Sequence, residues 1–222
     1  MYDIKKLAKK ENYDINDMLS IMEALRSPEG CPWDREQDHH SVKREFIEEC
    51  YEAVEAIDTD NAELLKEELG DVLLQIIFHC EMEKEKESFC FADVVEGLAK
   101  KMVTRHPHVF GDVVVENKDE VLTNWDSIKK ETKGQKTLKE TFESITTAMP
   151  ALMRYQKYVK KAKKYKLEEF ENACKIELDE KSSEEDIGMA IAKIVEIAQQ
   201  NGVDAEQALS QITKKEIDKI VI

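Results

Sequence analysis

The chain has 222 residues, of which 41% are hydrophobic and 36% are charged, and its formal net charge is −15. This composition suits a helix-rich protein with enough apolar residues for a core, and only seven glycines and four prolines disfavour a turn-rich β fold. The negative charge repels nucleic-acid backbones and anionic membranes, so we expect neither as a partner. It does not exclude a phosphate substrate, because divalent cations reverse the local charge.

The cysteines indicate a reducing compartment. There are five of them, an odd number, and no two have Cys-x-x-Cys spacing. The N-terminal residues lack the apolar segment of a signal peptide, and no apolar run approaches the roughly 18 residues of a membrane span. We therefore expect reduced thiols in a cytoplasmic protein.

The first clear amphipathic helix is predicted for residues 15–26, where methionines and leucines recur at helical spacing and a Ser-Pro-Glu-Gly segment follows. The next loop, residues 31–41, places Trp33 among polar and ionisable side chains. Two interpretations stay open. Either the Trp33 ring fills a gap in the core, or the loop covers a pocket lined by Trp33, Asp34 and Gln37.

Two acidic helices are predicted next, over residues 42–57 and 62–78. The second is apolar nearly all round, which predicts burial, yet Glu68, Asp71 and Gln75 share one narrow stripe of its surface. The predicted apolar face of the first helix consists of Phe46, Cys50, Ala53, Val54 and Ile57.

The carboxylates of these helices have a spacing that suits a metal site, with Glu48-Glu49-x-x-Glu52 on the first and Glu68-x-x-Asp71 on the second. Antiparallel packing would set Glu49 and Glu52 opposite Glu68 and Asp71, where the carboxylates repel one another unless a cation binds. Mg²⁺ prefers oxygen ligands and commonly bridges carboxylates to phosphates. The first group alone is a common solvated motif, but the second lies in an apolar helix, so together they favour metal binding. Zinc is not expected, because no histidines and cysteines have zinc-ligand spacing.

A further amphipathic helix is predicted for residues 91–104, followed by a helix-ending Pro107. Lys101 and Arg105 project from its last turn on the same side. They are either cations favoured by the helix dipole or a pair of phosphate clamps. The predicted inner face of this helix consists of Phe91, Val94, Val95, Leu98, Ala99 and Met102.

The remaining segments are predicted as helices with one linker. Residues 120–130 form a helix, and residues 133–136 are the best candidate for a linker. Residues 137–165 are predicted to be helical with a basic, solvated face. Residues 184–222 give two helices broken at an Asn-Gly pair.

Several of these segments resemble those of a known family. They are GCPWDREQDHHS (30–41), FIEECYEAVEAI (46–57), LLKEELGDVLLQIIFH (64–79), RHPHVFGD (105–112) and NWDSIKKETKG (124–134). In this order they look like the MazG family of nucleoside triphosphate pyrophosphohydrolases. The resemblance implies an all-α helical-bundle fold, usually a homodimer, which hydrolyses nucleoside triphosphates between the α and β phosphates to a monophosphate and diphosphate. It also implies Mg²⁺, with Mn²⁺ as a substitute that the same ligands could bind.

The resemblance further assigns roles to individual residues. The metal ligands that it implies are Glu49, Glu52, Glu68 and Asp71. One more catalytic carboxylate, Glu48, is implied as a candidate to orient the attacking water. With the loop residues included, the candidate substrate-binding residues are Trp33, Asp34, Lys101, Arg105 and Trp125. Among these, the two cations would contact phosphates, and Trp125 would stack on the base or line the pocket.

The second half of the chain resembles a second MazG domain that has shrunk. Residues 151–170 resemble its opening and residues 184–220 its closing part, but the family's E-L-G-D tetrad is replaced by Asp186-Ile187-Gly188-Met189. A methionine cannot ligate Mg²⁺. We therefore expect a catalytic domain over residues 1–134 and a degenerate, inactive helical domain over residues 137–222, serving packing, dimer contacts or regulation.

Two alternative functions stay open at this point. One is a related all-α pyrophosphohydrolase with a narrow substrate, such as dUTP or phosphoribosyl-ATP. The other is a non-catalytic dimeric protein that binds partners, although the first half keeps every ligand of the predicted site. Neither the base nor the sugar preference follows from the residues.

Overall fold

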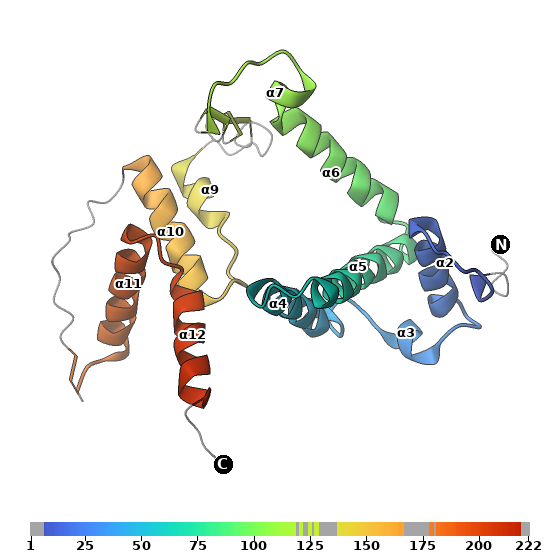
Figure 1. Ribbon diagram of the computed structural model, residues 1–222, viewed down its shortest axis with the longest axis horizontal. Coiled ribbons are helices and arrows are strands. Elements are labelled where there is room, and N and C mark those ends of the chain that lie inside the picture. The colour runs from blue at the N-terminus through green and yellow to red at the C-terminus, as the bar shows by residue number, and fades with distance from the viewer. Residues whose placement is uncertain are drawn as a thin grey trace. The chain divides into compact units, whose positions relative to one another are not determined.

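The computed structural model describes residues 7–118, 120–121, 124–125, 127–128, 137–166, 178–179 and 181–218. Throughout these residues the regular structure is α-helical, which confirms the predicted all-α class (Figure 1). The chain divides into two compact units, residues 1–125 and residues 126–222. The predicted linker, residues 133–136, lies outside the described residues.

The first unit is built on a pair of long helices, α4 and α5, which pack along each other (Figure 1). Asp60 joins them in a tight turn with φ of 51°, a left-handed conformation that aspartate tolerates better than most residues. Asn61 then caps α5 by accepting a hydrogen bond from the Leu64 backbone N–H. The helices of this unit are α2 (Ile15–Arg26), α3 (Pro32–Glu36), α4 (Lys43–Asp58), α5 (Ala62–Glu85), α6 (Phe91–Arg105) and α7 (Pro107–Phe110).

Most predicted helix positions in this unit are confirmed, with two differences. The helix over residues 15–26 has the predicted bounds and begins at a capping box formed by Asp14 and Asp17. The loop over residues 31–41 contains a short helix, α3, started by Pro32, whose fixed φ suits the first helical turn. The helix predicted to end at residue 78 continues to Glu85, because no helix-breaking residue follows Phe78.

The core of the first unit lies between α2 and the C-terminal half of α5. Its buried side chains are Met22, Val42, Ile77, Phe78 and Met82. The acidic half of α5 therefore lies outside this core, where α5 faces α4.

Several apolar faces predicted to be buried are exposed, so these predictions are wrong. On α4, whose apolar face was identified without a prediction of burial, Val54 and Ile57 are likewise 48% and 57% exposed, and only Ala53 and Ala56 are buried. On α5, Leu69 is 54% exposed, and on α6 the residues Val94, Val95, Leu98 and Met102 are all exposed. Periodicity identifies an apolar face but does not say which molecule covers it, and this unit covers only part of each face.

The second unit contains α9 (Leu138–Glu143), α10 (Ala151–Tyr165), α11 (Glu184–Gln200) and α12 (Ala205–Asp218). Residues 137–165 were predicted to be helical without a break, but α9 and α10 are separate helices. Pro150 lies directly before α10 and cannot donate a backbone hydrogen bond to continue a preceding helix. The predicted break at Asn201-Gly202 is confirmed, with Gly202 at φ 70°. Among the described helices, none combines the length and apolar character required to cross a membrane.

Candidate functional site

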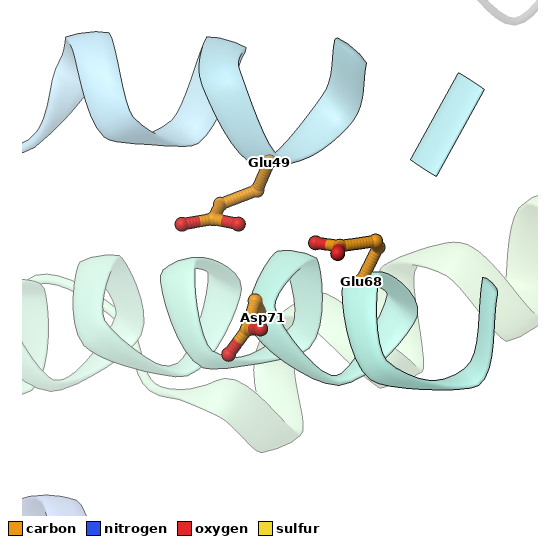
Figure 2. Close-up of side chains that lie close together, drawn as sticks. All are labelled: Glu49, Glu68 and Asp71. Atoms are coloured by element: carbon orange, nitrogen blue, oxygen red, sulfur yellow. The ribbon is translucent and has the colours of Figure 1, made fainter. Parts of the chain in front are cut away.

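The two acidic helices bring carboxylates together, as their spacing predicted. Glu49 of α4 faces Glu68 and Asp71 of α5 (Figure 2). Each of the three offers a carboxylate oxygen that lies within 4.8 Å of those of the other two. Glu68 and Asp71 are three residues apart on α5, so they lie on one side of that helix. Carboxylate oxygens so closely grouped are the donor set of a hard divalent cation.

Burial and mutual repulsion make this cluster electrostatically unfavourable by itself. Glu68 is only 8% exposed, and Glu49 and Asp71 are half-buried. Burial raises the pKa of Glu49, and the charges of Asp71, Glu52 and Glu68 raise it further. Burial likewise raises the pKa of Glu68, followed by the charges of Glu52 and its neighbours. A bound cation would relieve both effects, because it supplies the missing opposite charge.

The other two predicted carboxylates lie beside the cluster on α4. Glu52 is exposed and is not one of the three clustered residues, but hydrogen bonding with Glu52 contributes to the raised pKa values of Glu49 and Glu68. Glu48 is exposed and lies one turn before Glu52 on the same side of α4.

Gln75 places a side-chain oxygen without a hydrogen-bond partner on the stripe of α5 that carries Glu68 and Asp71. It lies one turn after Asp71, and its Oε1 atom is buried without a hydrogen-bond partner. A buried acceptor without a partner is costly, so such groups in native proteins need an explanation. An unpaired oxygen beside three carboxylates fits a site that binds a cation with its water shell.

The loop that carries Trp33 is held by a residue that the sequence analysis missed, Arg26. The Arg26 side chain is 7% exposed, donates two hydrogen bonds to Glu85, and donates to the backbone carbonyls of Asp34 and Gln37. Trp33 itself is 60% exposed, so the interpretation that its ring fills the core is wrong. The signal for Arg26 was weak, because a basic residue in the last turn of a helix is common.

A second group forms where α6 ends. The Arg105 guanidinium lies over the Trp125 ring, 5.4 Å from its centroid, and the His106 ring meets the same indole edge-on at 4.8 Å. The Arg105 Nε and the His108 Nδ1 atoms are buried without partners. Lys101 is exposed. The structure thus brings Arg105 and Trp125 together, and the described residues from 120 to 128 are helical as predicted.

A third group was missed altogether. His39, from the segment before α4, contacts His79 of α5, and the same His39 contacts Glu83. These residues are about 40 positions apart in the sequence, so no local spacing could have indicated the contact.

In the second unit, Asp186 serves to start a helix. Its carboxylate accepts the backbone N–H of Ser183, and Ser183 in turn caps the Asp186 N–H, a capping box at the start of α11. Met189 is 64% exposed. The described residues of this unit hold no cluster of metal-ligating side chains.

Comparison with known proteins gives consistent matches. The MazG nucleotide pyrophosphohydrolase domain matches residues 37–110. A nucleoside triphosphate pyrophosphohydrolase/pyrophosphatase MazG of Thermotoga maritima is 39% identical, over 91% of this chain and 82% of that protein. A nucleoside triphosphate pyrophosphohydrolase of Escherichia coli K12 is 35% identical, over 93% of this chain and 88% of that protein. An uncharacterized protein of Bacillus subtilis, YabN, is 43% identical over 67% of this chain and 30% of its own length.

Proposed function

This chain belongs to the MazG family of nucleoside triphosphate pyrophosphohydrolases, and from that premise we propose that it hydrolyses nucleoside triphosphates between the α and β phosphates. The products would be a nucleoside monophosphate and diphosphate. The observation that carries the proposal is the cluster of Glu49, Glu68 and Asp71, because triphosphate hydrolysis needs cations beside the phosphates. We further propose a broad substrate range that serves to clean the nucleotide pool, in the cytoplasm where nucleotides are used.

The donor set fits Mg²⁺, with Mn²⁺ as a substitute. All the clustered atoms are carboxylate oxygens, and burial and the neighbouring carboxylates raise the pKa of Glu49 and of Glu68, an effect that a bound cation would offset. Glu49, Glu68 and Asp71 would hold the cation, with Glu52 as a fourth ligand from α4. When bound, the cation would offset the triphosphate charge and lower the pKa of a bound water.

The protein's own residues would mainly position the reactants. Glu48 shares one side of α4 with Glu52, and it would orient the attacking water. Arg105 would contact phosphates, supported by its unpartnered Nε atom, and Trp125 would hold the guanidinium in place through the observed ring contact. The exposed Lys101 one turn earlier would add a second cation. Trp33 and Asp34 would line the nucleoside end of the pocket.

We propose that the active form is a homodimer. An exposed apolar stripe runs along α4 at spacings of three and four residues, and it consists of Ile47, Tyr51, Val54 and Ile57. Exposed stripes of this kind in a soluble domain usually mark an interface. Tyr51→Glu should therefore convert the protein to a monomer in a light-scattering measurement, whereas an unchanged mass would exclude this face.

For the second unit we propose a supporting role without its own active site. Asp186 is engaged in the α11 cap and Met189 offers no oxygen ligand. Packing, dimer contacts or regulation are the roles that remain for α9 to α12.

The test is a panel of ribonucleoside and deoxyribonucleoside triphosphates with Mg²⁺, analysed for monophosphate and diphosphate. We expect several bases to be hydrolysed, and we expect Glu52→Gln and Asp71→Asn to lose most activity. Glu55→Gln, one turn further along α4 and exposed, is the matched control and should keep it. Full activity of Glu52→Gln or Asp71→Asn would refute this site.

The same panel separates the alternatives. Hydrolysis of dUTP or phosphoribosyl-ATP alone would indicate a narrow-substrate enzyme. No hydrolysis, together with no binding of Mg²⁺ and a non-hydrolysable nucleotide by calorimetry, would indicate a non-catalytic dimeric interaction protein.

A further inference from the structure

Two histidines from distant parts of the chain meet beside the acidic helices. The Nδ1 atoms of His39 and His79 lie 2.7 Å apart, and the Nε2 atom of His39 lies 2.6 Å from Glu83 Oε1. Both rings are half-buried. The Phe46 ring of α4 meets the His79 ring edge-on, with 5.6 Å between centroids. The histidine pair therefore joins the segment before α4 to both α4 and α5.

The rings of His39 and His79 have the geometry of a hydrogen bond between their Nδ1 atoms. The ring centroids of His39 and His79 are 5.0 Å apart and the rings are inclined by only 14°. Because the Nδ1 atoms are much closer than the centroids, the rings meet edge to edge in nearly one plane, which aims an N–H at a ring lone pair. A shared zinc ion does not fit, since Zn–N bonds of about 2.0–2.1 Å in tetrahedral geometry hold two nitrogens about 3.3 Å apart.

The proton positions follow from Glu83. Its carboxylate only accepts hydrogen bonds, so His39 donates from Nε2, and in the neutral pair His39 Nδ1 accepts from His79 Nδ1–H. A first added proton enters at His79 Nε2 while the shared proton moves to His39 Nδ1, which puts the positive charge beside Glu83. A second added proton would set two N–H groups against each other with no acceptor, and the contact would break.

The charged groups near the histidine pair lie on α5 and in the segment before α4. Glu83 carries the nearby negative charge on α5, and Lys86 lies 2.8 Å from the same carboxylate. Hydrogen bonds from Lys86 and then His39 lower the pKa of Glu83 to about 2, so it stays ionised. Burial and the neighbouring His39 lower the pKa of His79. In the segment before α4, Asp38 and His40 flank His39, and α4 contributes the uncharged Phe46 ring.

The pair lies next to the candidate metal site along the same two helices. On α5, His79 is two turns beyond Asp71, with Gln75 between them. On α4, Phe46 is three residues before Glu49. Phe46 and His79 thus make the contact between α4 and α5 that lies next to the carboxylates. Loosening this contact would shift Glu49 relative to Asp71.

We infer that His39 and His79 share a proton and act as positioning residues, holding α4 against α5 so that the carboxylates are preorganised for a cation. One added proton leaves the contact intact and a second releases it. In taking Glu49, Glu68 and Asp71 as the cation ligands, we rely on the proposed function.

The first experiment observes the protons directly. In the full chain with ¹⁵N-labelled histidine, long-range ¹H–¹⁵N spectra should show one strongly downfield proton coupled to the Nδ1 atoms of both rings. This signal should survive the uptake of one proton on acidification and vanish with the second. Two rings that titrate independently, without such a proton, would overturn the inference. Because no nucleotide is used, this result does not depend on whether the protein hydrolyses one.

The second experiment separates the two halves of the contact. An asparagine amide reaches the position of imidazole Nδ1, and a glutamine amide that of Nε2. His39→Asn should therefore keep the link to His79, and His39→Gln should keep only the link to Glu83. Losing one hydrogen bond should weaken Mn²⁺ binding about 2- to 10-fold in His39→Gln and less in His39→Asn.

The control is His40→Ala, which removes the exposed neighbouring histidine and should bind Mn²⁺ like the natural chain. The natural chain should also lose Mn²⁺ affinity when the histidine pair takes up its second proton. His39→Gln should not show this pH-dependent loss of affinity. Equal affinities in the natural chain and both folded His39 variants would overturn the positioning role. If Mn²⁺ binds as expected but no triphosphate is hydrolysed, the proposed function fails and the positioning role stands.

Discussion

Replacing Asp71 with asparagine should have opposite effects on stability with and without a divalent cation. The substitution keeps the shape of the side chain and removes one of three charges whose oxygens lie within 4.8 Å of one another. Without a cation this charge only repels Glu49 and Glu68. With a cation bound, the proposed site would use this charge as a ligand.

The magnitude follows from the distance. Two unit charges 4.8 Å apart repel by about 1–3.5 kcal/mol for effective dielectric constants between 80 and 20. Because Asp71 is only half-buried, solvent screens part of this repulsion, and we expect Asp71→Asn to gain about 1–2 kcal/mol in total, or about 2–8 °C in melting temperature. Saturating Mg²⁺ at 100 times its dissociation constant should stabilise the natural chain by about 2.7 kcal/mol and the variant by much less.

The assay is thermal unfolding followed by circular dichroism at low ionic strength, first in EDTA and then in Mg²⁺. Glu55→Gln changes the net charge by the same amount on an exposed part of α4 and should stay within about 0.5 kcal/mol of the natural chain in both buffers. If Asp71→Asn melts at or below the natural temperature in EDTA, the carboxylates do not repel one another as described.

Three further predictions concern the scaffold of the first unit. The pKa of Glu83 is about 2, below its ordinary value of 4.5. The stability that the ionised Glu83 side chain contributes is therefore complete above pH 4.5 and is lost as the pH falls toward 2. Glu83→Gln should flatten the fall in melting temperature over that range. Ile77→Ala should cost about 2–5 kcal/mol in urea unfolding, because this side chain is 1% exposed in the core. Arg26→Lys should cost about 1–3 kcal/mol and speed proteolysis of residues 31–41, because lysine cannot bridge Glu85 and two carbonyls together.

Each of these has a clear contrary result. An unchanged acid slope in Glu83→Gln would mean that its ion pairs contribute nothing to stability. A cost below about 1 kcal/mol for Ile77→Ala would mean that the core refills the cavity. Unchanged proteolysis in Arg26→Lys would show that other contacts hold the loop.

The sequence was sufficient where local rules decide the structure. The bounds of α2 follow from its cap and periodicity, and the meeting of Glu49 with Glu68 and Asp71 follows from two helices joined by a short turn. The sequence was insufficient where the partner is distant. Neither the contact between His39 and His79 nor the four bonds of Arg26 has a local signature.

The apolar faces show a different limit. Val94 and Leu98 were predicted to lie on the inner face of α6 and are exposed, because periodicity cannot separate a surface covered by the same chain from one left for another copy. The split between α9 and α10 was not predicted, although Pro150 itself signals a break in the helix.

The tight turn at Asp60 has a consequence for how the site forms. Glu49 and Glu68 are separated by only 19 positions, so the carboxylate cluster is made entirely within one helical hairpin. Contacts of such short sequence separation require little loop-closure entropy and form early in folding. We therefore expect the crowded acids to assemble before the core between α2 and α5 can stabilise them, so divalent cations in the refolding buffer should accelerate folding.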